Sequence, residues 1–382
     1  MDHIRFGIIG MGVQGSLYGA ILAGLPLPYF GALAKPKGCV LTAVSSRSPE
    51  TQAKAAAMGA AYFGNWKDLI DSGLCDAVIV TVPHFLHHEV AIYAFQKGLH
   101  VLCEKPAGVR ASDAQKMISV QGDHTLAMIL NQRTNPLFRH LKDVITSGQL
   151  GDLRRSNWII NSWWRPDSYY ASSPWRGSWK GEGGGILVNQ LPHQLDLWME
   201  LTGVPEQVYC LAKNGAWRNI HVENDVTVTA KYPNGASGVL VSCTHDPLGT
   251  DRLELDFSCG KIVVENSEKA TIYRFKQPES VWNDTVSHMQ MVALSRNPSA
   301  LYEVEEIHLS QPFGAAYVEI FENFASHLLD GTPLIADGQA GLRQVQLANA
   351  IALASWKNQP VSVPCSETEY DTYLQQLMAQ EG

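Results

Sequence analysis

The segment IRFGIIGMGVQGSLYGAILAGL, residues 4–25, decides the fold class, because an apolar run leads into a glycine turn and then into a helical pattern. The glycines follow the spacing G-x-G-x-x-G. The first glycine permits a tight turn, and the second lets a pyrophosphate approach the backbone at the positive end of the helix. Between a predicted strand and a predicted helix, this spacing predicts a dinucleotide-binding turn. The expected contacts in this turn are Gly10, Met11, Gly12, Val13 and Gly15.

Further apolar runs continue the alternation of strand and helix. Residues 76–82 are nearly all apolar, as expected for a strand that is covered on both faces. A helical pattern then closes at Gly98, and the next strand, in LHVLCEKPAG (99–108), ends at a Glu-Lys pair followed by proline. Residues 125–133 favour a sixth strand. This order predicts an α/β fold with a doubly wound parallel sheet, a Rossmann domain, whose ligands bind at the carboxyl ends of the strands.

The end of the second strand, in CVLTAVSSRSPE (39–50), bears on the choice of cofactor. A free ribose 2′-hydroxyl usually meets Asp or Glu at this place, but Ser45, Ser46 and Arg47 stand here instead. Small hydroxyls and a guanidinium suit a 2′-phosphate, so Ser46 and Arg47 favour NADP slightly over NAD, or indicate tolerance of both. The alternative is that Arg47 is only a solvated loop charge.

Composition limits the class of protein. The chain has 382 residues, which suits two domains, and 45% apolar with 17% charged residues is a globular composition. A net charge of −8 argues against nucleic-acid binding, and no basic cluster or long apolar run indicates a membrane partner. Seven scattered cysteines without a C-x-x-C motif, and the lack of a signal-peptide pattern, predict a cytoplasmic location.

The stretch NSWWRPDSYYASSPWRGSWKGEGGG, residues 161–185, is rich in Trp, Tyr, Arg and small polar residues and has no helix or strand period. Aromatic rings with adjacent polar groups bind sugars, because a ring covers the apolar C–H face while arginines or amides bind the hydroxyls. The alternative is an aromatic packing corner between domains. We expect at least one of these tryptophans to line a substrate pocket.

The glycine run 183–185 leads into a predicted helix with a leucine-rich buried face that ends at Gly203. Asn189 and His193 are four residues apart, so a regular helix would place them on one side. Pro192 lies between them and lacks a backbone donor, so either the first turn is kinked or the regular helix begins near the proline. In both cases we expect the two side chains near one another.

Residues 221–266 alternate β-branched and polar side chains, and an Asn-Gly pair within them is typical of a hairpin turn. This texture predicts an α+β domain with a large open, mostly antiparallel sheet. His221, Glu223 and Asp225 lie on one face of a predicted strand. Because no nearby cysteine or second histidine completes a ligand set, we expect no metal.

Helical patterns at 315–331 and near 338–357 follow a poorly patterned stretch, 267–315, which receives no assignment. We therefore predict two domains. The first, over 1–130, binds NAD(P), and the second, over 131–382, is an α+β domain for substrate binding and oligomerisation. The last of these helices is expected to pack back toward the Rossmann domain.

Several stretches in order resemble the glucose–fructose oxidoreductase / inositol dehydrogenase / rhizopine catabolism (Gfo/Idh/MocA) family. They are the glycine turn, VTVPHFLHHEVAIYAFQKGLHVLCEKPAG (80–108) and NQRTNPLFRHLKDVITSGQLGDLRR (131–155). The resemblance implies that Lys105 points at the nicotinamide and the substrate hydroxyl. It also implies that Glu104 helps to hold the lysine and the cofactor's amide region, and that Pro106 fixes the loop. A desolvated lysine can donate a hydrogen bond to a developing alkoxide or help to move its proton.

A second motif departs from the family's usual form. Where the family has GGG-x-L-x-Asp-x-Gly-x-His-x-x-Asp, this chain has GGGILVNQLPHQLD (183–196), so Asn189 replaces aspartate and Leu191 replaces glycine. By resemblance, His193 is the expected proton acceptor, and its ordinary pKa range suits that task. Asn189 can bind a sugar hydroxyl but cannot take a proton, which leaves Lys105 and His193 as the two titratable partners.

The expected contacts extend beyond the glycine turn. Further cofactor contacts are expected at Pro83, His84, His87, Glu104, Lys105 and Arg176. Substrate contacts are expected at Lys105, Asn131, Trp163, Arg165, Tyr169, Trp175, Asn189 and His193.

The resemblance implies an NAD(P)-dependent oxidoreductase that transfers a hydride between a secondary hydroxyl of a sugar, cyclitol or glycoside and the nicotinamide. One alternative is an NAD-dependent redox glycosidase of the same family, which oxidises its sugar and reduces it again within one cycle. Another is a non-catalytic NADP-binding sensor, against which the intact Lys105 and His193 speak. Family members form homodimers or homotetramers through the sheet of the second domain, and we expect the same here.

Overall fold

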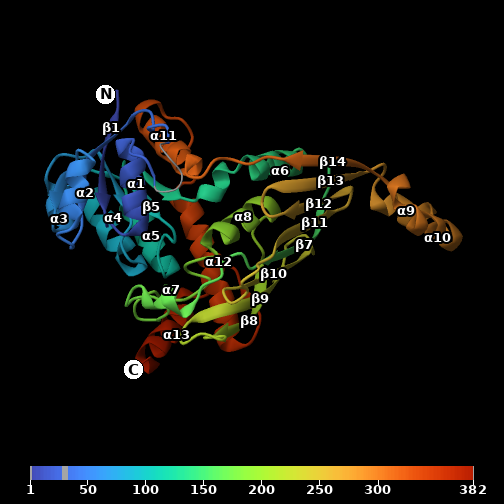
Figure 1. The fold of residues 1–382 in the computed structure, drawn as a ribbon. Helices are drawn as coiled ribbons and strands as arrows, with labels where there is room; N and C mark the ends of the chain where they lie inside the picture. The colour runs from blue at the N-terminus through green and yellow to red at the C-terminus, as the bar shows by residue number, and fades with distance from the viewer. Residues whose placement is uncertain (1, 28–32, 382) are drawn as a thin grey trace.

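The computed structural model describes residues 2–27 and 33–381 of the chain. Within these ranges the chain forms one six-stranded and one nine-stranded sheet, each packed against helices (Figure 1). The predicted fold class is therefore confirmed: a doubly wound parallel sheet is followed by an α+β half with a large open sheet. No helix in the described ranges combines the length and the apolar content needed to cross a bilayer.

The first sheet is parallel, with the strand order β3-β2-β1-β4-β5-β6. Its strands are β1 (Ile4–Ile9), β2 (Cys39–Ser45), β3 (Ala61–Phe63), β4 (Ala77–Val80), β5 (His100–Glu104) and β6 (Leu126–Ile129). The connecting helices are α1 (Val13–Ala23), α2 (Thr51–Ala57), α3 (Trp66–Asp71), η1 (His84–Leu86), α4 (His87–Gln96) and α5 (Ala111–Val120). Every residue of β4 is buried, which explains its continuous apolar sequence. The strand order reverses beside β1, and dinucleotides bind at such a reversal.

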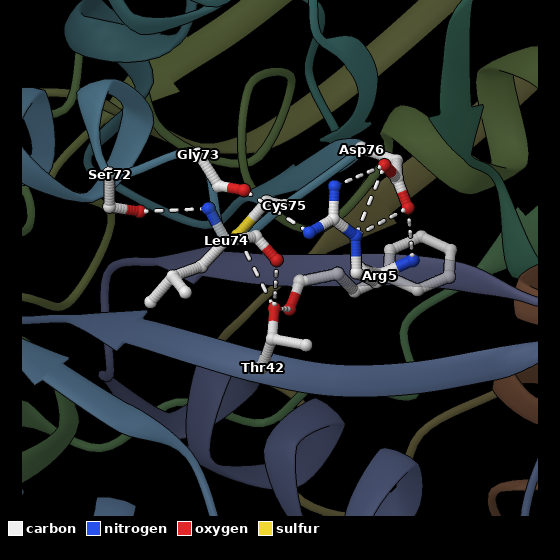
Figure 2. Close-up of polar contacts among 8 residues, drawn as sticks. Arg5, Thr42, Ser72, Gly73, Leu74, Cys75 and Asp76 are labelled. Atoms are coloured by element: carbon white, nitrogen blue, oxygen red, sulfur yellow. Dashed lines mark hydrogen bonds and ion pairs between the residues drawn. The ribbon is translucent and has the colours of Figure 1, made fainter.

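Arg5 and Asp76 form an ion pair at the amino-terminal ends of β1 and β4 (Figure 2). The glycine turn lies at the opposite ends of these strands. The Arg5 guanidinium donates to the Asp76 carboxylate from Nη2 at 2.7 Å and from Nε at 3.1 Å. The Arg5 backbone amide donates to the same carboxylate at 2.9 Å. Burial alone would raise the pKa of Asp76, but the hydrogen bonds and charge of Arg5 outweigh burial and lower it.

The second sheet is mixed but mostly antiparallel, with the order β14-β13-β12-β11-β7-β10-β9-β8-β15. Its strands are β7 (Leu153–Ile160), β8 (Gln207–Asn214), β9 (Glu223–Lys231), β10 (Ser237–Cys243), β11 (Asp251–Phe257), β12 (Gly260–Glu265), β13 (Lys269–Phe275), β14 (Tyr302–His308) and β15 (Val361–Ser362). Among the described strand pairs of this sheet, β7 and β10 run parallel, and the others are antiparallel. The prediction of a large open sheet is confirmed.

Helices cover one face of the second sheet. They include α6 (Pro136–Thr146), α8 (Pro192–Thr202) and α12 (Gly338–Lys357), and they share one apolar core with the strands. Within that core, the indole of Trp198 in α8 donates to the Ser156 hydroxyl of β7 at 3.1 Å. The helix α8 begins at the proline and ends at Gly203, which settles the choice between a kinked first turn and a later start.

The stretch 267–315, which sequence patterning leaves unassigned, contains β13, α9 (Glu279–Thr285), α10 (His288–Arg296), η3 (Pro298–Ala300) and β14. The helices α9 and α10 project beyond the sheet at its β14 edge (Figure 1), and none of their residues is buried. Without a buried face they lack the apolar period on which a sequence-based helix prediction depends.

Two late helices return to the first sheet. α11 (Ala315–Asp330) buries Phe321 and Phe324 in one core with residues of β1 and α1. α12 contacts both α5 and α8, and α13 (Glu367–Gln380) follows it. The boundary between residues 130 and 131 stays a prediction, because α11 belongs to the second predicted domain by sequence and to the first sheet by packing.

Candidate active site

The glycine turn between β1 and α1 has the geometry of a phosphate cradle. Gly10 has a φ of +98°, and a Cβ there would lie 2.8 Å from the Thr81 carbonyl oxygen. A Cβ at Gly15 would lie 1.9 Å from the Gly10 oxygen, so helix and turn pack too closely for a side chain. A Cβ at Gly12 would meet nothing within 4 Å, and no side chain caps α1. The open, uncapped amino terminus of α1 therefore fits a pyrophosphate. Met11 is buried beside this turn, whereas Val13 is 82% exposed.

The end of β2 presents the residues expected at the ribose. Ser46 is half-buried, and its hydroxyl accepts from the Ser48 amide at 3.2 Å, while its carbonyl accepts from Tyr62 at 2.9 Å. Arg47 is exposed directly after β2. An exposed guanidinium beside a tethered hydroxyl fits a 2′-phosphate, but the preference for NADP stays a prediction.

The loop after β4 carries Pro83 and two buried histidines with different environments. His84 places Nδ1 3.2 Å from the Glu182 carbonyl oxygen and its ring 5.6 Å from the ring of Trp175. His87 lies with Nδ1 2.8 Å from the Pro106 carbonyl oxygen and Nε2 2.8 Å from the Val82 carbonyl oxygen. A neutral imidazole donates from one nitrogen only, so one of these two contacts is a hydrogen bond, and the ring lies between the loops after β4 and β5. The structure brings His84 to the aromatic stretch but turns His87 into the protein.

The two residues of the Glu-Lys pair at the end of β5 have different surroundings. Glu104 is buried and accepts from the Tyr18 hydroxyl of α1 and, at 2.9 Å, from the Lys105 backbone amide. It therefore holds the lysine's backbone. The Lys105 side chain extends the other way, and Nζ donates to the Asn189 carbonyl oxygen at 2.5 Å. Burial lowers the pKa of Lys105, and the charges of Glu104 and Glu182 oppose that effect.

His193 lies in the first turn of α8, one residue after its proline. Its Nδ1 is buried and has no hydrogen-bond partner among the described residues. Burial, and then the positive charge of Lys105, lower the pKa of His193 to about 3. The imidazole is therefore neutral, with the Lys105 charge acting on it. The two titratable side chains of the prediction thus act on one another electrostatically, although they are 88 positions apart in the chain.

The aromatic stretch folds over this pair around Tyr169, which belongs to α7 (Asp167–Ala171). The guanidinium of Arg165 lies 4.8 Å and that of Arg176 4.4 Å from the Tyr169 ring centroid. Arg176 also lies 4.5 Å from the ring of Trp175 and donates from Nη1 to the Tyr169 hydroxyl at 2.6 Å. The Asn189 side-chain amide donates to the same hydroxyl at 3.3 Å. Cation–π contacts thus help to order this stretch, in which α7 is a short helix of five residues that the sequence pattern does not predict.

Two of the expected substrate residues lie at the margin of this cluster. Asn131 begins η2 (Asn131–Thr134) after β6, and its Nδ2 donates to the Tyr317 hydroxyl of α11 at 3.4 Å. The Tyr317 ring lies 5.1 Å from the ring of Tyr18, so Asn131 sits on the Glu104 side of the site. Trp163 is partly buried and packs against the core of the second half. A contact between Trp163 and the substrate stays a prediction, whereas Trp175 faces His84.

Several polar atoms at this site are buried without a partner among the described residues. They are Asn131 Oδ1, Arg165 Nε, Arg176 Nε and His193 Nδ1. Buried polar atoms are nearly always hydrogen-bonded, so an acceptor-rich and donor-rich ligand would complete this site. A polyhydroxylated molecule has that character.

Two carboxylates close to this site are not among the predicted contacts. Glu182 is buried, and its carboxylate accepts from the Gly177 amide at 2.7 Å and from the Asn189 side-chain amide. Glu223 accepts from the amides of Gly185 and Leu187 at 2.9 and 3.1 Å, so it holds the glycine run. The one sequence signal for Glu182 is its position between glycines. Its hydrogen-bond partners can be identified only in the folded loop.

Comparison with known proteins now identifies the class. A family profile described as an oxidoreductase family with an NAD-binding Rossmann fold matches residues 4–130, and a profile for the GFO/IDH/MocA C-terminal domain matches residues 138–263. The chain belongs to the Gfo/Idh/MocA family of NAD-binding oxidoreductases, as the sequence resemblance predicted.

Individual relatives are distant. Levoglucosan dehydrogenase of Pseudarthrobacter phenanthrenivorans is 27% identical over 211 residues, which cover 53% of this chain and 52% of that protein. The rhizopine catabolism protein MocA of Rhizobium meliloti is 25% identical over 205 residues, covering 53% and 58%. The chain thus matches little more than half the length of these relatives. The WlbA dehydrogenase of Bordetella pertussis, solved with NADH and UDP-GlcNAcA, superposes with a TM-score of 0.76 at 23% identity, covering 95% and 100%.

Proposed function

We propose that this protein is an NAD(P)-dependent dehydrogenase that oxidises a secondary hydroxyl of a sugar, cyclitol or glycoside, or reduces the corresponding ketone. The observation that carries the proposal is that Lys105, directly after β5, donates to the turn that precedes α8 and acts with its charge on the buried ring of His193. Lys105 Nζ lies 2.5 Å from the Asn189 carbonyl oxygen, and the unpartnered Nδ1 of His193 follows on the next turn of the chain.

The residues present fit a nicotinamide dinucleotide. The glycine turn and the amino terminus of α1 would hold its pyrophosphate, and Ser46 with Arg47 would face its adenosine ribose. When bound, the nicotinamide supplies the hydride acceptor or donor. Residues 39–49, which form β2 and the start of the loop after it, contain no Asp or Glu, and this supports the use of a 2′-phosphorylated cofactor.

Lys105 and His193 divide the remaining chemistry. The Lys105 ammonium donates a hydrogen bond to the substrate oxygen and stabilises negative charge that develops on it. The neutral His193 receives the hydroxyl proton during oxidation and returns it during reduction. Because burial keeps the pKa of His193 at about 3, its ring is unprotonated throughout the neutral pH range, so Nδ1 can accept a hydrogen bond from the hydroxyl, but the same low pKa makes the unliganded ring a weak base.

The surroundings support a carbohydrate substrate. Tyr169 and Trp175 provide ring faces, and Arg165 and Arg176 carry buried Nε atoms without partners among the described residues. Rings that cover C–H groups beside fixed donors suit a polyol ring. The similarity to levoglucosan dehydrogenase points to the same class of substrate.

A substrate screen tests the proposal. The purified protein is incubated with NAD or NADP and with panels of hexoses, inositols, sugar acids and glycosides, and nicotinamide reduction is followed by absorbance. We expect reduction with at least one panel member, and a rate that is lower by about 30-fold or more with the variant Lys105→Met. Cofactor binding is measured separately by fluorescence of the bound reduced nicotinamide.

Two other outcomes would contradict the proposal. Release of phenol from aryl glycosides without added cofactor and without net nicotinamide reduction would indicate a redox glycosidase. Tight binding of the cofactor with no turnover of any panel member, in either direction, would indicate a sensor.

A further inference from the structure

Glu182 is a buried carboxylate at the site to which the proposed mechanism gives no task. Glu182 is 2% exposed and lies in the turn between Gly181 and the glycine run. One carboxylate oxygen accepts from the Gly177 backbone amide at 2.7 Å, and the other accepts from Asn189 Nδ2. Its carbonyl oxygen lies 3.2 Å from Nδ1 of His84. Burying a charge is costly unless it is paired, so this placement requires a compensating gain.

The groups that face Glu182 come from both halves of the protein. Lys105 after β5 and Arg176 in the aromatic stretch act on it with positive charge. Its negative charge in turn acts on Glu223, across the glycine run. Burial raises the pKa of Glu182, while the Gly177 amide and the Asn189 amide oppose that rise. The carboxylate is thus the negative partner of two cations that surround the substrate position.

The contact with Asn189 fixes an orientation. A carboxylate accepts hydrogen bonds, so only the amide nitrogen of Asn189 can face it. The same nitrogen lies 3.3 Å from the Tyr169 hydroxyl. The Asn189 side-chain oxygen accepts no hydrogen bond from the described residues and is left for a ligand, while the Asn189 backbone oxygen accepts from Lys105. One residue therefore connects the carboxylate to the catalytic lysine.

We propose that Glu182 is the positioning residue of the substrate site. It orients Asn189 so that its side-chain oxygen accepts from a substrate hydroxyl and its backbone oxygen aims Lys105, and it balances the charge of Lys105 and Arg176. The inference rests on the proposed function for its kinetic consequences, but its structural and electrostatic parts stand on the unliganded protein. It predicts that the substrate offers a hydroxyl donor at this point, next to the reacting carbon.

An exchange of carboxylate and amide tests the proposal. Glu182→Gln keeps the shape of the side chain but removes its charge. In this variant the side-chain amide at position 182 faces the side-chain amide of Asn189. We expect kcat/KM to fall by about tenfold or more, as for loss of a charged hydrogen bond, with the cofactor's Kd within about twofold of wild type. The double variant Glu182→Gln/Asn189→Asp places the carboxylate on the other partner. We expect it to recover most of the loss, with an altered pH profile of kcat/KM.

The matched control is Glu381→Gln. Glu381 accepts from the Lys180 amide at 2.9 Å on the same loop, but it lies on the helix α13 side, outside the site. We expect kinetics like those of wild type. If Glu182→Gln retains kcat/KM within about twofold, or if the double variant is no better than the single one, Glu182 is a structural residue and the proposal is wrong.

A second readout separates this inference from the proposed function. The pH dependence of Lys105 modification by an amine-reactive reagent, followed by mass spectrometry, reports the lysine's pKa without any substrate. Since the charge of Glu182 supports the ammonium, Glu182→Gln should move that dependence to lower pH by about half a unit or more, and Glu381→Gln should not. A failed substrate screen with this shift present would overturn the proposed function alone. Absence of the shift would overturn the role of Glu182.

Discussion

At the scale of single residues, Lys105 is positioned by two buried carboxylates, Glu104 and Glu182, in two different ways. Glu104 holds the backbone of Lys105, and the turn that carries Glu182 receives its side chain through Asn189. The lysine is therefore fixed at both ends before any ligand binds. Such preorganisation is what makes a hydrogen-bond donor effective at a developing negative charge.

Replacement of Lys105 by methionine should remove this donor with little change in volume. We expect a loss of about 2–4 kcal/mol of transition-state stabilisation, comparable to the loss of an oxyanion donor. The measurement is kcat/KM for the best substrate of the screen. Lys97→Met is the control, because Lys97 pairs with Asp71 on the surface. A Lys105→Met variant as active as the control would disprove the assigned role.

The predicted cofactor preference depends on Arg47 in the same local way. If its guanidinium binds a 2′-phosphate, Arg47→Ala should weaken NADP binding by about tenfold or more, because a charged hydrogen bond is lost. The affinity for NAD should stay within about twofold. Kd values from nicotinamide fluorescence measure both, and Arg47→Lys should retain part of the NADP affinity. Equal losses for the two cofactors would show that Arg47 does not read the phosphate.

At the scale of elements, the glycine run before α8 explains why buried acids gather around this turn. A Cβ at Gly185 would lie 1.9 Å from the Glu223 carbonyl oxygen, so β9 approaches the turn as closely as a backbone can. The Glu223 carboxylate then accepts the turn's amides. Burial raises the pKa of Glu223 to about 7 against hydrogen bonds that lower it.

This raised pKa has a defined effect on stability. The folded state holds the Glu223 proton more tightly than the unfolded state, so the stabilisation is complete below the ordinary carboxyl pKa of about 4.3. It is lost as the pH rises toward about 7. The melting temperature of wild type relative to Glu223→Gln should therefore fall between about pH 5 and pH 8, and other buried acids cancel in the difference. A difference that stays constant over this range would contradict the assignment.

Sequence reasoning succeeds where a residue's task is local. The spacing of the glycine turn, the strand end at Lys105 and the start of α8 at Pro192 follow from backbone rules that operate over a few residues. The role of Glu182 could not be predicted by such rules, because its hydrogen-bond partners, Gly177 and Asn189, depend on how the loop between them folds. His87 also shows the effect of the fold: its ring nitrogens face backbone carbonyl groups inside the protein, and its contact with the cofactor stays a prediction.

At the scale of the whole molecule, the two halves share a core. α11 follows the second sheet in the chain, yet its Phe321 ring packs 5.4 Å from Tyr18 of α1, and Phe324 packs 6.0 Å from Phe6 of β1. The apolar period of 315–331 predicts a helix, but it cannot tell which of two sheets the apolar face will meet. For that reason the sequence predicts a domain boundary at residue 130, whereas the packing places α11, from the second predicted domain, in the core of the first.

Phe321→Ala should therefore destabilise the dinucleotide-binding half, although position 321 lies far from it in the chain. The side chain is fully buried, so we expect a cost of about 3–5 kcal/mol in the free energy of unfolding. Urea denaturation, followed by both tryptophan fluorescence and loss of cofactor binding, measures it. Leu329→Ala on the same helix is the control, since Leu329 is 37% exposed. Loss of the second half alone, with cofactor binding intact, would contradict this coupling.

The late arrival of α11 also constrains biosynthesis. A nascent chain will have released β1 and α1 from the ribosome long before Phe321 and Phe324 are translated, and until then part of their apolar surface lies open. Chaperones bind such surfaces, so a transcript truncated before Ala315 should yield a fragment that is retained by chaperones or degraded rather than a free nucleotide-binding module.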